Sequence, residues 1–550
     1  MYTNGSIYVG LGDEGQRVTM QLNMSNRHGL IAGASGTGKT ITMKTLAESF
    51  SDAGVPVFLC DVKGDVSGIA SPGEQNEGME KRIDKFGIRD CFSYKGYPVC
   101  FWDIYQEGGH PVRATVSDMG PDILSRILNL TEAQEGVLNI VFRIADDKGL
   151  MLIDLKDLRI LLNYVNEHKK EYITTYGAIS TQSVGGILRA LLPLEAQGGD
   201  LFFGEPALDI FDWIRTDLSG QGIVNVLNCV KLVQNPTLYA SFLLWMMAEL
   251  FERLPEAGDL DKPKLVFFFD EAHMLFDGAP KVLVQKIEQV VKLIRSKGVG
   301  IYFVTQSPSD IPDGVLAQLS NRVQHALRAY TPAEQKAVRV AAQSFRENPK
   351  FKTEDVIMQL GVGEALTSFL DEEGVPGIVQ QTAIICPQSL MAPVDEAVRK
   401  DQMANDNMSK YDVAVDTESA YEVLTGQQAE AAEQAKLEAE RAAFEKEKAE
   451  FEAQKQKEAE AALKAQEKAE AAALKQKEKE EAAALKQKLK EEEAVRKQKE
   501  REAEAERKKK EKEEEKKAKA AERRKTKIEN ALINTGAQIL KRGLLKTLFK

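Results

Sequence analysis

A glycine-rich segment that ends in a lysine and a threonine is the feature that most limits what this chain can fold into. The segment reads Gly33-Ala34-Ser35-Gly36-Thr37-Gly38-Lys39-Thr40 and matches the pattern G-x-x-x-x-G-K-[ST] in full. An apolar run suited to a buried strand, 29–32, precedes it, and 41–50 has the apolar spacing of a helix. A glycine loop between a strand and a helix N-terminus turns backbone N–H groups toward an anion, so the sequence predicts a phosphate site.

The residues of this loop have separate predicted roles in binding a nucleotide. We expect the loop backbone and the first helical turn to hold the phosphates, and this binding set is Gly33, Ala34, Ser35, Gly36, Thr37, Gly38, Lys39, Thr40 and Ile41. The Lys39 ammonium would reach the β- and γ-phosphates, and the Thr40 hydroxyl would bind Mg²⁺. ATP and Mg²⁺ are therefore the expected cofactors.

A second apolar strand ends in two acidic residues, as a nucleotide hydrolase requires. It reads Leu265-Val266-Phe267-Phe268-Phe269-Asp270-Glu271. Asp270, at the carboxyl end of the strand, can hold Mg²⁺ through water, and Glu271 is placed to polarise the attacking water. Acidic pairs after apolar strands also serve as helix caps, but beside the glycine loop we predict the catalytic role.

A third strand, 300–306, ends in Thr305 and Gln306, which we expect to sense the γ-phosphate; a plain exit from strand to loop is the alternative. Further strands are predicted at 57–61 and 223–227. Helical stretches separate these strands. The pattern therefore predicts an α/β fold with a doubly wound, mostly parallel sheet.

These motifs resemble those of P-loop ATPases of the HerA/FtsK superfamily. More closely, the chain resembles the HerA-like bacterial ATPases with a helicase HerA-like C-terminal domain, and the segments that carry this resemblance are 26–33, 61–65, 202–208, 293–300 and 321–328. The segment Asp61-Val62-Lys63-Gly64 is also similar to the Asp-Pro-Lys-Gly of conjugative coupling ATPases. The resemblance covers about residues 1–395 and implies a RecA-like sheet and ATP hydrolysis.

The resemblance also implies how such chains assemble. Members of the superfamily form rings, commonly hexamers, that bind ATP between subunits, receive an arginine from the neighbouring subunit and move DNA. An arginine placed in this way spreads the charge of the transition state. Arg295 is the leading candidate, Arg322 and Arg328 compete with it, and each could instead be an ordinary surface or ion-paired residue.

The charges of the chain are divided unevenly between a front part and a tail. Of the 73 basic and 84 acidic residues, 34 and 28 lie in 427–550, which leaves 39 basic and 56 acidic residues in 1–426. The front part therefore carries a net −17 and the tail a net +6. Because binding to phosphate backbones needs clustered Lys and Arg, the acidic front argues against broad nonspecific DNA binding.

Six parts are predicted along the chain. They are the first part of an ATPase core over 1–64, a mostly helical insertion over 65–220, the remainder of the core over 221–395, a linker over 396–426, a helix or coiled coil rich in Ala, Glu and Lys over 427–530, and a basic amphipathic segment over 531–550.

The tail repeats every eleven residues from Ala461 onward, with Leu463, Leu474 and Leu485 on one helical stripe. Glu and Lys three and four residues apart can also support a solitary exposed helix. The last twenty residues mix Ile, Leu and Phe with Lys and Arg, which suits a partner groove, an anionic membrane surface or a helix folded back on the core. An ATP-gated scaffold that recruits a protein or membrane partner through this tail is therefore the alternative to a DNA motor.

The chain shows no sign of membrane insertion or export in its sequence. It has no apolar run of the roughly 18–20 residues that a membrane span needs, and its first residues lack the pattern of a signal peptide. Its five cysteines, Cys60, Cys91, Cys100, Cys229 and Cys386, have no metal-binding spacing. We expect buried, reduced thiols in a cytoplasmic protein.

Overall fold

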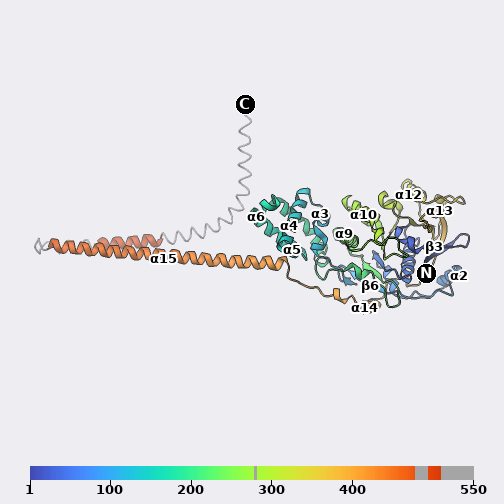
Figure 1. Ribbon diagram of the computed structural model, residues 1–550, viewed down its shortest axis with the longest axis horizontal. Coiled ribbons are helices and arrows are strands. Elements are labelled where there is room, and N and C mark those ends of the chain that lie inside the picture. The colour runs from blue at the N-terminus through green and yellow to red at the C-terminus, as the bar shows by residue number, and fades with distance from the viewer. Residues whose placement is uncertain (278–280, 477–493, 509–550) are drawn as a thin grey trace, which may run out of the picture. The chain divides into compact units, whose positions relative to one another are not determined.

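The computed structural model describes residues 1–277, 281–476 and 494–508, and contacts within the chain divide it into two units, Met1–Ala432 and Glu433–Lys550. In the described part of the first unit, thirteen strands form one sheet (Figure 1). The strand order along the sheet is β1-β2-β13-β12-β11-β4-β10-β9-β5-β8-β6-β7, with β3 paired to β2.

The strands from β11 to β7 in this order are parallel. They are β4 (Gly29–Ala32), β5 (Val57–Asp61), β6 (Val99–Asp103), β7 (His110–Pro111), β8 (Val224–Asn228), β9 (Leu265–Phe269), β10 (Val299–Thr305) and β11 (Asn321–His325). Antiparallel strands extend the β11 edge: β12 (Glu364–Ser368), β13 (Gln380–Ile384), β2 (Ser6–Gly12), β1 (Tyr2–Thr3) and β3 (Arg17–Gln21). The five strands expected from the sequence are all present and parallel, so the predicted α/β fold with a mostly parallel sheet is confirmed.

Helices cover both faces of the sheet because successive side chains of each buried strand point to opposite sides. In β9, Val266 and Phe268 pack with α1 (Lys39–Asp52), whereas Phe267 and Phe269 pack on the other face. The helices α9 (Pro236–Arg253) and α10 (Lys281–Leu293) pack on this other face, together with Phe267 and Phe269, and form the second hydrophobic core of the unit. The sheet is thus the middle layer of three, and its central strands β4, β9 and β10 are buried over their full length.

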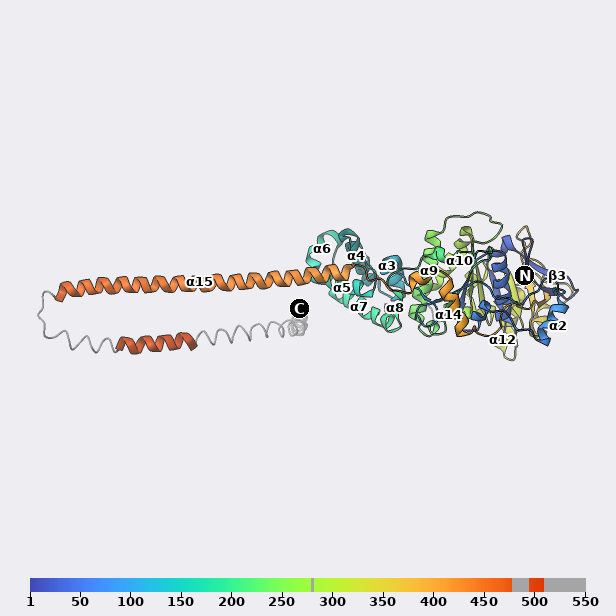
Figure 2. The ribbon, with the colours of Figure 1, turned by 90° about the horizontal axis from the view of Figure 1, so that it is seen from below.

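A group of helices continues this second core away from the sheet, and Figures 1 and 2 both show it as a separate cluster within the first unit. Its members are α3 (Val116–Ile127), α4 (Glu132–Lys148), α5 (Leu155–Glu167), α6 (Lys169–Tyr176), α7 (Thr181–Ala196) and α8 (Gly199–Phe202). The predicted insertion over 65–220 contains them, but it also supplies β6 and β7, which the sequence analysis did not expect. A short apolar run such as 99–102 has no period that separates a strand from a buried helix.

The segment 396–426, predicted as a linker, belongs to the first unit and packs against the rest of it. It contains α14 (Glu396–Asn405) and the start of α15 (Ala420–Gln476). The Nδ1 atom of His110 lies 2.6 Å from Asp412 Oδ1, Arg113 Nη1 donates to the Tyr411 carbonyl at 2.7 Å, and Leu424 is 1% exposed. These contacts hold the segment to the edge of the sheet near β7, so it is not a detached linker. The remaining helices are α2 (Glu77–Lys85), α11 (Asp313–Leu316), α12 (Pro332–Gln343) and α13 (Thr353–Gln359).

The tail is helical where it is described. α15 is continuous over 57 residues, and 494–508 is also helix (Figure 2). The side chains of 425–463 are all exposed. The helix expected over 427–530 is therefore seen in its described parts, while the coiled coil stays a prediction and the segment 531–550 lies outside the described residues.

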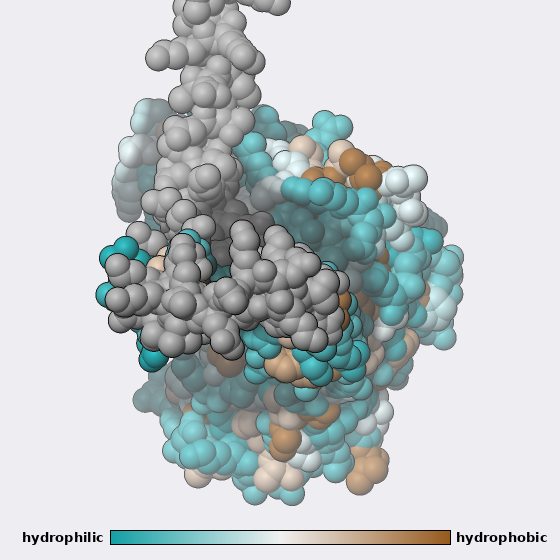
Figure 3. All heavy atoms as spheres, turned by 90° about the vertical axis from the view of Figure 1, so that its left-hand side faces the viewer, coloured by the Kyte–Doolittle hydropathy of each residue, from teal (hydrophilic) through white to brown (hydrophobic). Residues whose placement is uncertain are grey.

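The outer surface is largely hydrophilic where it can be seen. The described residues visible in Figure 3 are mostly hydrophilic, and the hydrophobic ones occur in small separate groups. Among the described helices, none combines the length and the apolar character that a membrane span requires. Cys60, Cys100, Cys229 and Cys386 are buried, but Cys91 is exposed, so the expectation of five buried thiols is wrong for Cys91.

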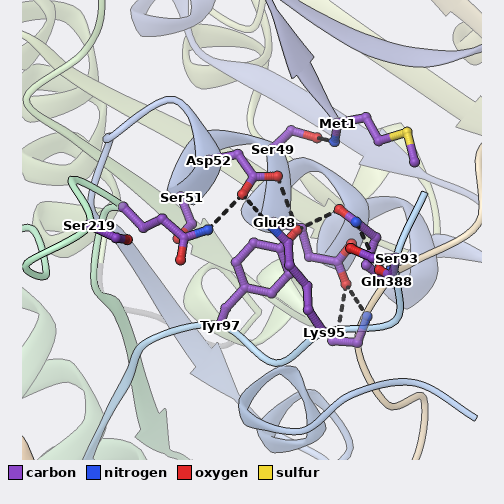
Figure 4. A network of polar contacts seen from close by, with 12 residues as sticks. Met1, Glu48, Ser49, Ser51, Asp52, Ser93, Lys95, Tyr97, Ser219 and Gln388 are labelled. Carbon is purple, nitrogen blue, oxygen red and sulfur yellow. Dashed lines mark hydrogen bonds and ion pairs between the residues drawn. The ribbon is translucent and has the colours of Figure 1, made fainter. Parts of the chain in front are cut away.

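A polar network ties the C-terminal half of α1 to the chain near residue 388 (Figure 4). The buried Glu48 carboxylate accepts the backbone N–H of Gln388 at 2.9 Å, and the Tyr97 hydroxyl donates to the Gln388 side chain at 2.8 Å. Asp52 on the same helix pairs with Lys95 at 2.6 Å. Because a buried carboxylate is stable only when it is hydrogen-bonded, these contacts hold the helix that follows the glycine loop in one position.

Two buried histidines should make the stability of the first unit depend on pH. His28 accepts from the Ile301 N–H at 3.0 Å and lies 2.8 Å from the Val291 carbonyl, and His325 contacts the Thr42 hydroxyl at 2.8 Å and the Glu364 carbonyl at 2.9 Å. Each ring thus has one acceptor and one donor role, as in neutral imidazole. Burial lowers the pKa of both rings from 6.5 to about 4.

Since the unfolded chain binds these protons more readily, stability is complete above pH 6.5 and falls as the pH drops toward 4. We expect a loss of about 2 kcal/mol per histidine between pH 6.5 and pH 5. Urea unfolding followed by tryptophan fluorescence at several pH values measures the free energy of unfolding. His325→Gln should reduce the pH dependence, whereas His168→Gln, at a partly exposed position, should not; equal pH slopes for wild type and His325→Gln would contradict the expectation.

Candidate functional site

The glycine loop lies between β4 and α1, at the carboxyl edge of the parallel strands. Gly36 and Gly38 have φ values of 75° and 113°, which side-chain-bearing residues rarely adopt. Gly33 has φ 153°, and a Cβ atom there would lie 2.5 Å from the Cβ of His325. Since β11, which ends in His325, pairs with β4, the floor of the loop requires glycine at position 33.

Most backbone N–H groups of the loop have no hydrogen-bond acceptor among the described residues, as expected for an anion-binding site. Those of Gly33 and Ala34 donate to the carbonyls of Thr305 and Ala326, at 3.2 and 2.8 Å. The next seven N–H groups, 35–41, have no acceptor in the described part of the chain, and the first regular bond of α1 is Thr42 N–H to Gly38 O at 3.0 Å. Successive free N–H groups at a helix N-terminus form a binding site for phosphate oxygens.

Lys39 supplies the positive charge of this loop. Its side chain is largely buried, and Nζ donates to the carbonyls of Gly33 at 2.7 Å and Ala34 at 3.1 Å. Burial lowers its pKa, and the nearby Glu271 and Asp270 carboxylates oppose that shift. The ammonium is therefore held at the loop by two neutral carbonyls, and a phosphate would offer it a stronger partner.

Asp270 meets the requirement for a cation ligand. It follows β9, whose neighbour β10 pairs with β4, and it is 2% exposed. Its Oδ1 accepts the Glu271 N–H at 2.9 Å, while Oδ2 has no hydrogen-bond partner among the described residues. Burial raises its pKa to about 6. A buried carboxylate oxygen without a donor fits a hard divalent cation such as Mg²⁺, which the Thr40 hydroxyl could share.

Glu271 adopts a backbone conformation that is unusual for a residue with a side chain, with φ 47°. Its Oε1 pairs with Lys63 Nζ at 2.5 Å, and its Oε2 lies 3.4 Å from Gln306 Nε2 and 3.3 Å from His273 Nδ1. Burial alone would raise the pKa of Glu271, but Lys63 in particular, with Gln306 and His273, lowers it. The predicted base is thus ionised, and its partner Lys63 is a residue to which the sequence analysis gave no role.

The two residues predicted to sense the γ-phosphate differ in their surroundings. The buried Thr305 hydroxyl donates to Asp310 Oδ2 at 2.6 Å and so holds the turn after β10. Gln306 is exposed and reaches Glu271. Of the pair, Gln306 is therefore the one whose side chain faces the site.

The structure places two of the three candidate arginines, Arg295 and Arg322, away from the loop of their own chain, whereas Arg328 follows the carboxyl end of β11. Arg295 precedes β10 and Arg322 lies at the start of β11, at the amino ends of these strands, and a seven-residue strand spans about 23 Å. Arg322 donates to the carbonyls of Leu319 at 2.9 Å and Ser344 at 2.5 Å. Arg328 donates to the Met358 carbonyl at 2.7 Å. Among the described residues, the Arg295 guanidinium makes no hydrogen bond or ion pair, although the Arg295 carbonyl accepts the Gly298 N–H at 2.9 Å.

Sequence reasoning therefore named most of the charged groups that meet at this edge but missed Lys63 and His325. Lys63 lies in the segment Asp61-Val62-Lys63-Gly64, which the sequence analysis used only as a resemblance to conjugative coupling ATPases, without assigning a role to the lysine. His325 lies in 321–328, another segment quoted only for similarity. A lysine directly after a predicted parallel strand was a usable signal for Lys63, because that position belongs to the ligand-binding edge.

The loop, the buried acidic pair and the order β11-β4-β10-β9-β5 define a P-loop nucleotide-binding protein of the α/β class. The sequence model of the helicase HerA-like C-terminal family matches residues 7–472. The chain belongs to this family of P-loop ATPases, and the predicted membership is confirmed.

The chain was also compared with curated proteins and with solved structures. No curated protein matches the chain. The plasmid coupling protein TrwB, solved in complex with ADP and Mg²⁺, is 14% identical with a TM-score of 0.49, over 72% of this chain and 92% of TrwB. VirB4 of Thermoanaerobacter pseudethanolicus is 16% identical with a TM-score of 0.43, over 70% of this chain and 97% of VirB4.

Two substitutions separate phosphate binding from hydrolysis. Lys39→Ala should weaken ATP binding about tenfold or more, because a charge-assisted hydrogen bond contributes about 1.5–3 kcal/mol. Glu271→Gln should bind ATP and hydrolyse it about 10²–10⁴ times more slowly, since a positioned general base contributes that factor. Calorimetry and a phosphate-release assay measure these effects. Glu107→Gln, at an exposed glutamate in a surface ion pair, is the control, and normal turnover by Glu271→Gln would refute the assigned base.

Proposed function

We propose that this protein is a Mg²⁺-dependent ATP hydrolase. The observation that carries the proposal is the meeting, at one edge of the sheet, of seven backbone N–H groups that have no acceptor among the described residues, a buried ammonium and two buried carboxylates. The N–H groups and Lys39 would bind the β- and γ-phosphates. Thr40 and Asp270 would hold Mg²⁺, which, when bound, neutralises charge on the phosphates during transfer.

The remaining groups would act on water and on the γ-phosphate. Glu271 lies beside Asp270 and would take a proton from the attacking water as the bond to phosphorus forms and the ADP oxygen leaves. Gln306, within reach of Glu271, would orient that water or contact the γ-phosphate. The chemistry would be phosphoryl transfer to water, with the protein supplying position and charge.

We also propose a ring, as a hexamer, in which Arg295 acts on the nucleotide of the neighbouring subunit. Arg295 lies at the far end of β10 from its own P-loop, and its guanidinium makes no hydrogen bond or ion pair among the described residues, which supports a role across an interface. Arg322, whose guanidinium binds backbone carbonyls of its own chain, is the weaker candidate. An arginine in trans can raise the rate about 10³–10⁵-fold.

The polymer we propose for this ring is DNA, on the basis of the family. Because residues 1–426 carry a net −17, the binding surface would have to be a local basic region such as a pore rather than the whole exterior.

ATP turnover should rise several-fold when DNA is added at low salt, and the active species should have the mass of a ring. Phosphate release measured with single-stranded and double-stranded DNA and with RNA, together with light scattering on the same samples, tests both points. Turnover that ignores every nucleic acid would remove the motor proposal, and a monomeric active species would remove the ring.

A scaffold that uses ATP as a switch is the second candidate, and α15 favours it. This helix is exposed from 425 to 463 and presents the apolar side chains of Leu437, Phe444 and Phe451 among Glu, Lys and Arg, which suits recruitment of a protein partner. In this proposal hydrolysis changes the state of the first unit, and the tail delivers the partner.

Removing residues 433–550, the second unit, distinguishes the two functions. A DNA motor should keep its DNA-stimulated turnover within about twofold, because its site lies in Met1–Ala432. A scaffold should lose capture of its partner or of anionic vesicles while basal turnover continues. Phosphate release and vesicle co-sedimentation of the two chains decide between these outcomes.

A further inference from the structure

The ion pair between Lys63 and Glu271 is a contact that the proposed hydrolysis does not require. The two charged atoms are 2.5 Å apart, although the residues are 208 positions apart in the chain. A base that must take a proton from water is here bound by a cation instead. While the pair persists, one oxygen of the predicted base is engaged and its carboxylate is held toward Lys63.

The chain holds the backbone of Lys63 in place but leaves its side chain free to move. Lys63 follows β5, which pairs directly with β9, the strand that precedes Glu271. The Asp61 carboxylate accepts the N–H groups of Gly64 at 2.7 Å and Ser67 at 3.1 Å, which fixes the turn. The side chain of Lys63 is 47% exposed, so its four-carbon stem can swing without repacking the core.

Five charged groups share this edge of the sheet: Lys39, Lys63, Asp270, Glu271 and Asp310. The Lys63 charge helps to lower the pKa of Lys39, which shows that Lys63 lies within electrostatic reach of the phosphate loop. Lys39 itself is buried and bound to loop carbonyls. A γ-phosphate entering here adds negative charge beside Glu271, and Lys63 is the nearby cation with a mobile side chain.

We propose that Lys63 is a positioning residue that restrains Glu271 until ATP binds and then moves to the γ-phosphate, which releases Glu271 to act on water. ADP has no γ-phosphate, so the pair stays closed when ADP is bound. No covalent bond changes in this step; one ion pair is exchanged for another. The inference rests on the proposed ATPase function and adds to it a means of matching activity to the bound nucleotide.

The test compares the affinities of the full-length protein for two ligands, ADP and a non-hydrolysable ATP analogue, by calorimetry with Mg²⁺. Lys63→Ala should weaken analogue binding about tenfold and leave ADP binding unchanged, since only the analogue gains a charge-assisted contact with Lys63. Lys63→Arg should restore analogue binding. Lys231→Ala is the matched control, because Lys231 Nζ lies 2.6 Å from Glu107 Oε1 and the lysine side chain is half exposed, as that of Lys63 is. This substitution should change neither affinity.

The exchange also predicts a coupling between the two residues. Glu271→Gln frees Lys63 in advance and should tighten analogue binding, but only while Lys63 is present, so the double variant should bind the analogue as Lys63→Ala does. A merely structural role for Lys63 would weaken ADP and analogue binding equally. That result, or tightening by Glu271→Gln that persists in the double variant, would overturn the inference.

Failure of the proposed function gives a different result. If the wild-type protein binds neither ligand, the ATPase proposal itself fails. If the wild type binds and hydrolyses ATP while Lys63→Ala affects both ligands alike, only the role of Lys63 fails.

Discussion

Parallel pairing of β4, β10, β9 and β5 is the constraint on which the candidate site depends. The register sets Ala32 beside Thr305 and Phe269 beside Phe303, so the residues that follow these strands emerge at one edge. A P-loop alone offers N–H groups and an ammonium. The acidic pair meets it because β10 lies between β4 and β9, and that order is possible only because helices connect the strands and cover both faces.

Burial of charge at this edge shapes its chemistry. Within the described part of the chain, one oxygen of Asp270 has no donor, and burial raises the pKa of Asp270 to about 6, so the site is prepared for a cation rather than complete by itself. Glu271 sits deeper than a surface carboxylate yet stays ionised because Lys63 faces it. The same lysine thus keeps the proposed base charged and engages one of its oxygens.

How far the sequence predicted this structure can be judged from particular segments. Short apolar runs next to a motif, such as 29–32 and 265–269, were assigned correctly because their length and their polar ends leave little ambiguity. The strands β6 and β7 and the antiparallel β12 and β13 were missed, since nothing local distinguishes an added edge strand from a loop or a buried helix. The segment 396–426 looked like a linker because the contacts that hold it, such as Asp412 with His110, join polar residues far apart in the chain.

The sequence by itself determined the phosphate loop, because the glycine positions, the lysine and the helix that follows are local and act through the backbone of consecutive residues. It also determined the exposed helix after residue 425, because a run rich in Ala, Glu and Lys favours a helix through local propensity and through side-chain pairs three or four residues apart. Only the tertiary structure decided that Lys63 faces Glu271 and that His325 lies under Gly33. Those contacts depend on strand order and register, which arise from packing of the whole sheet and leave no local pattern in the residues themselves.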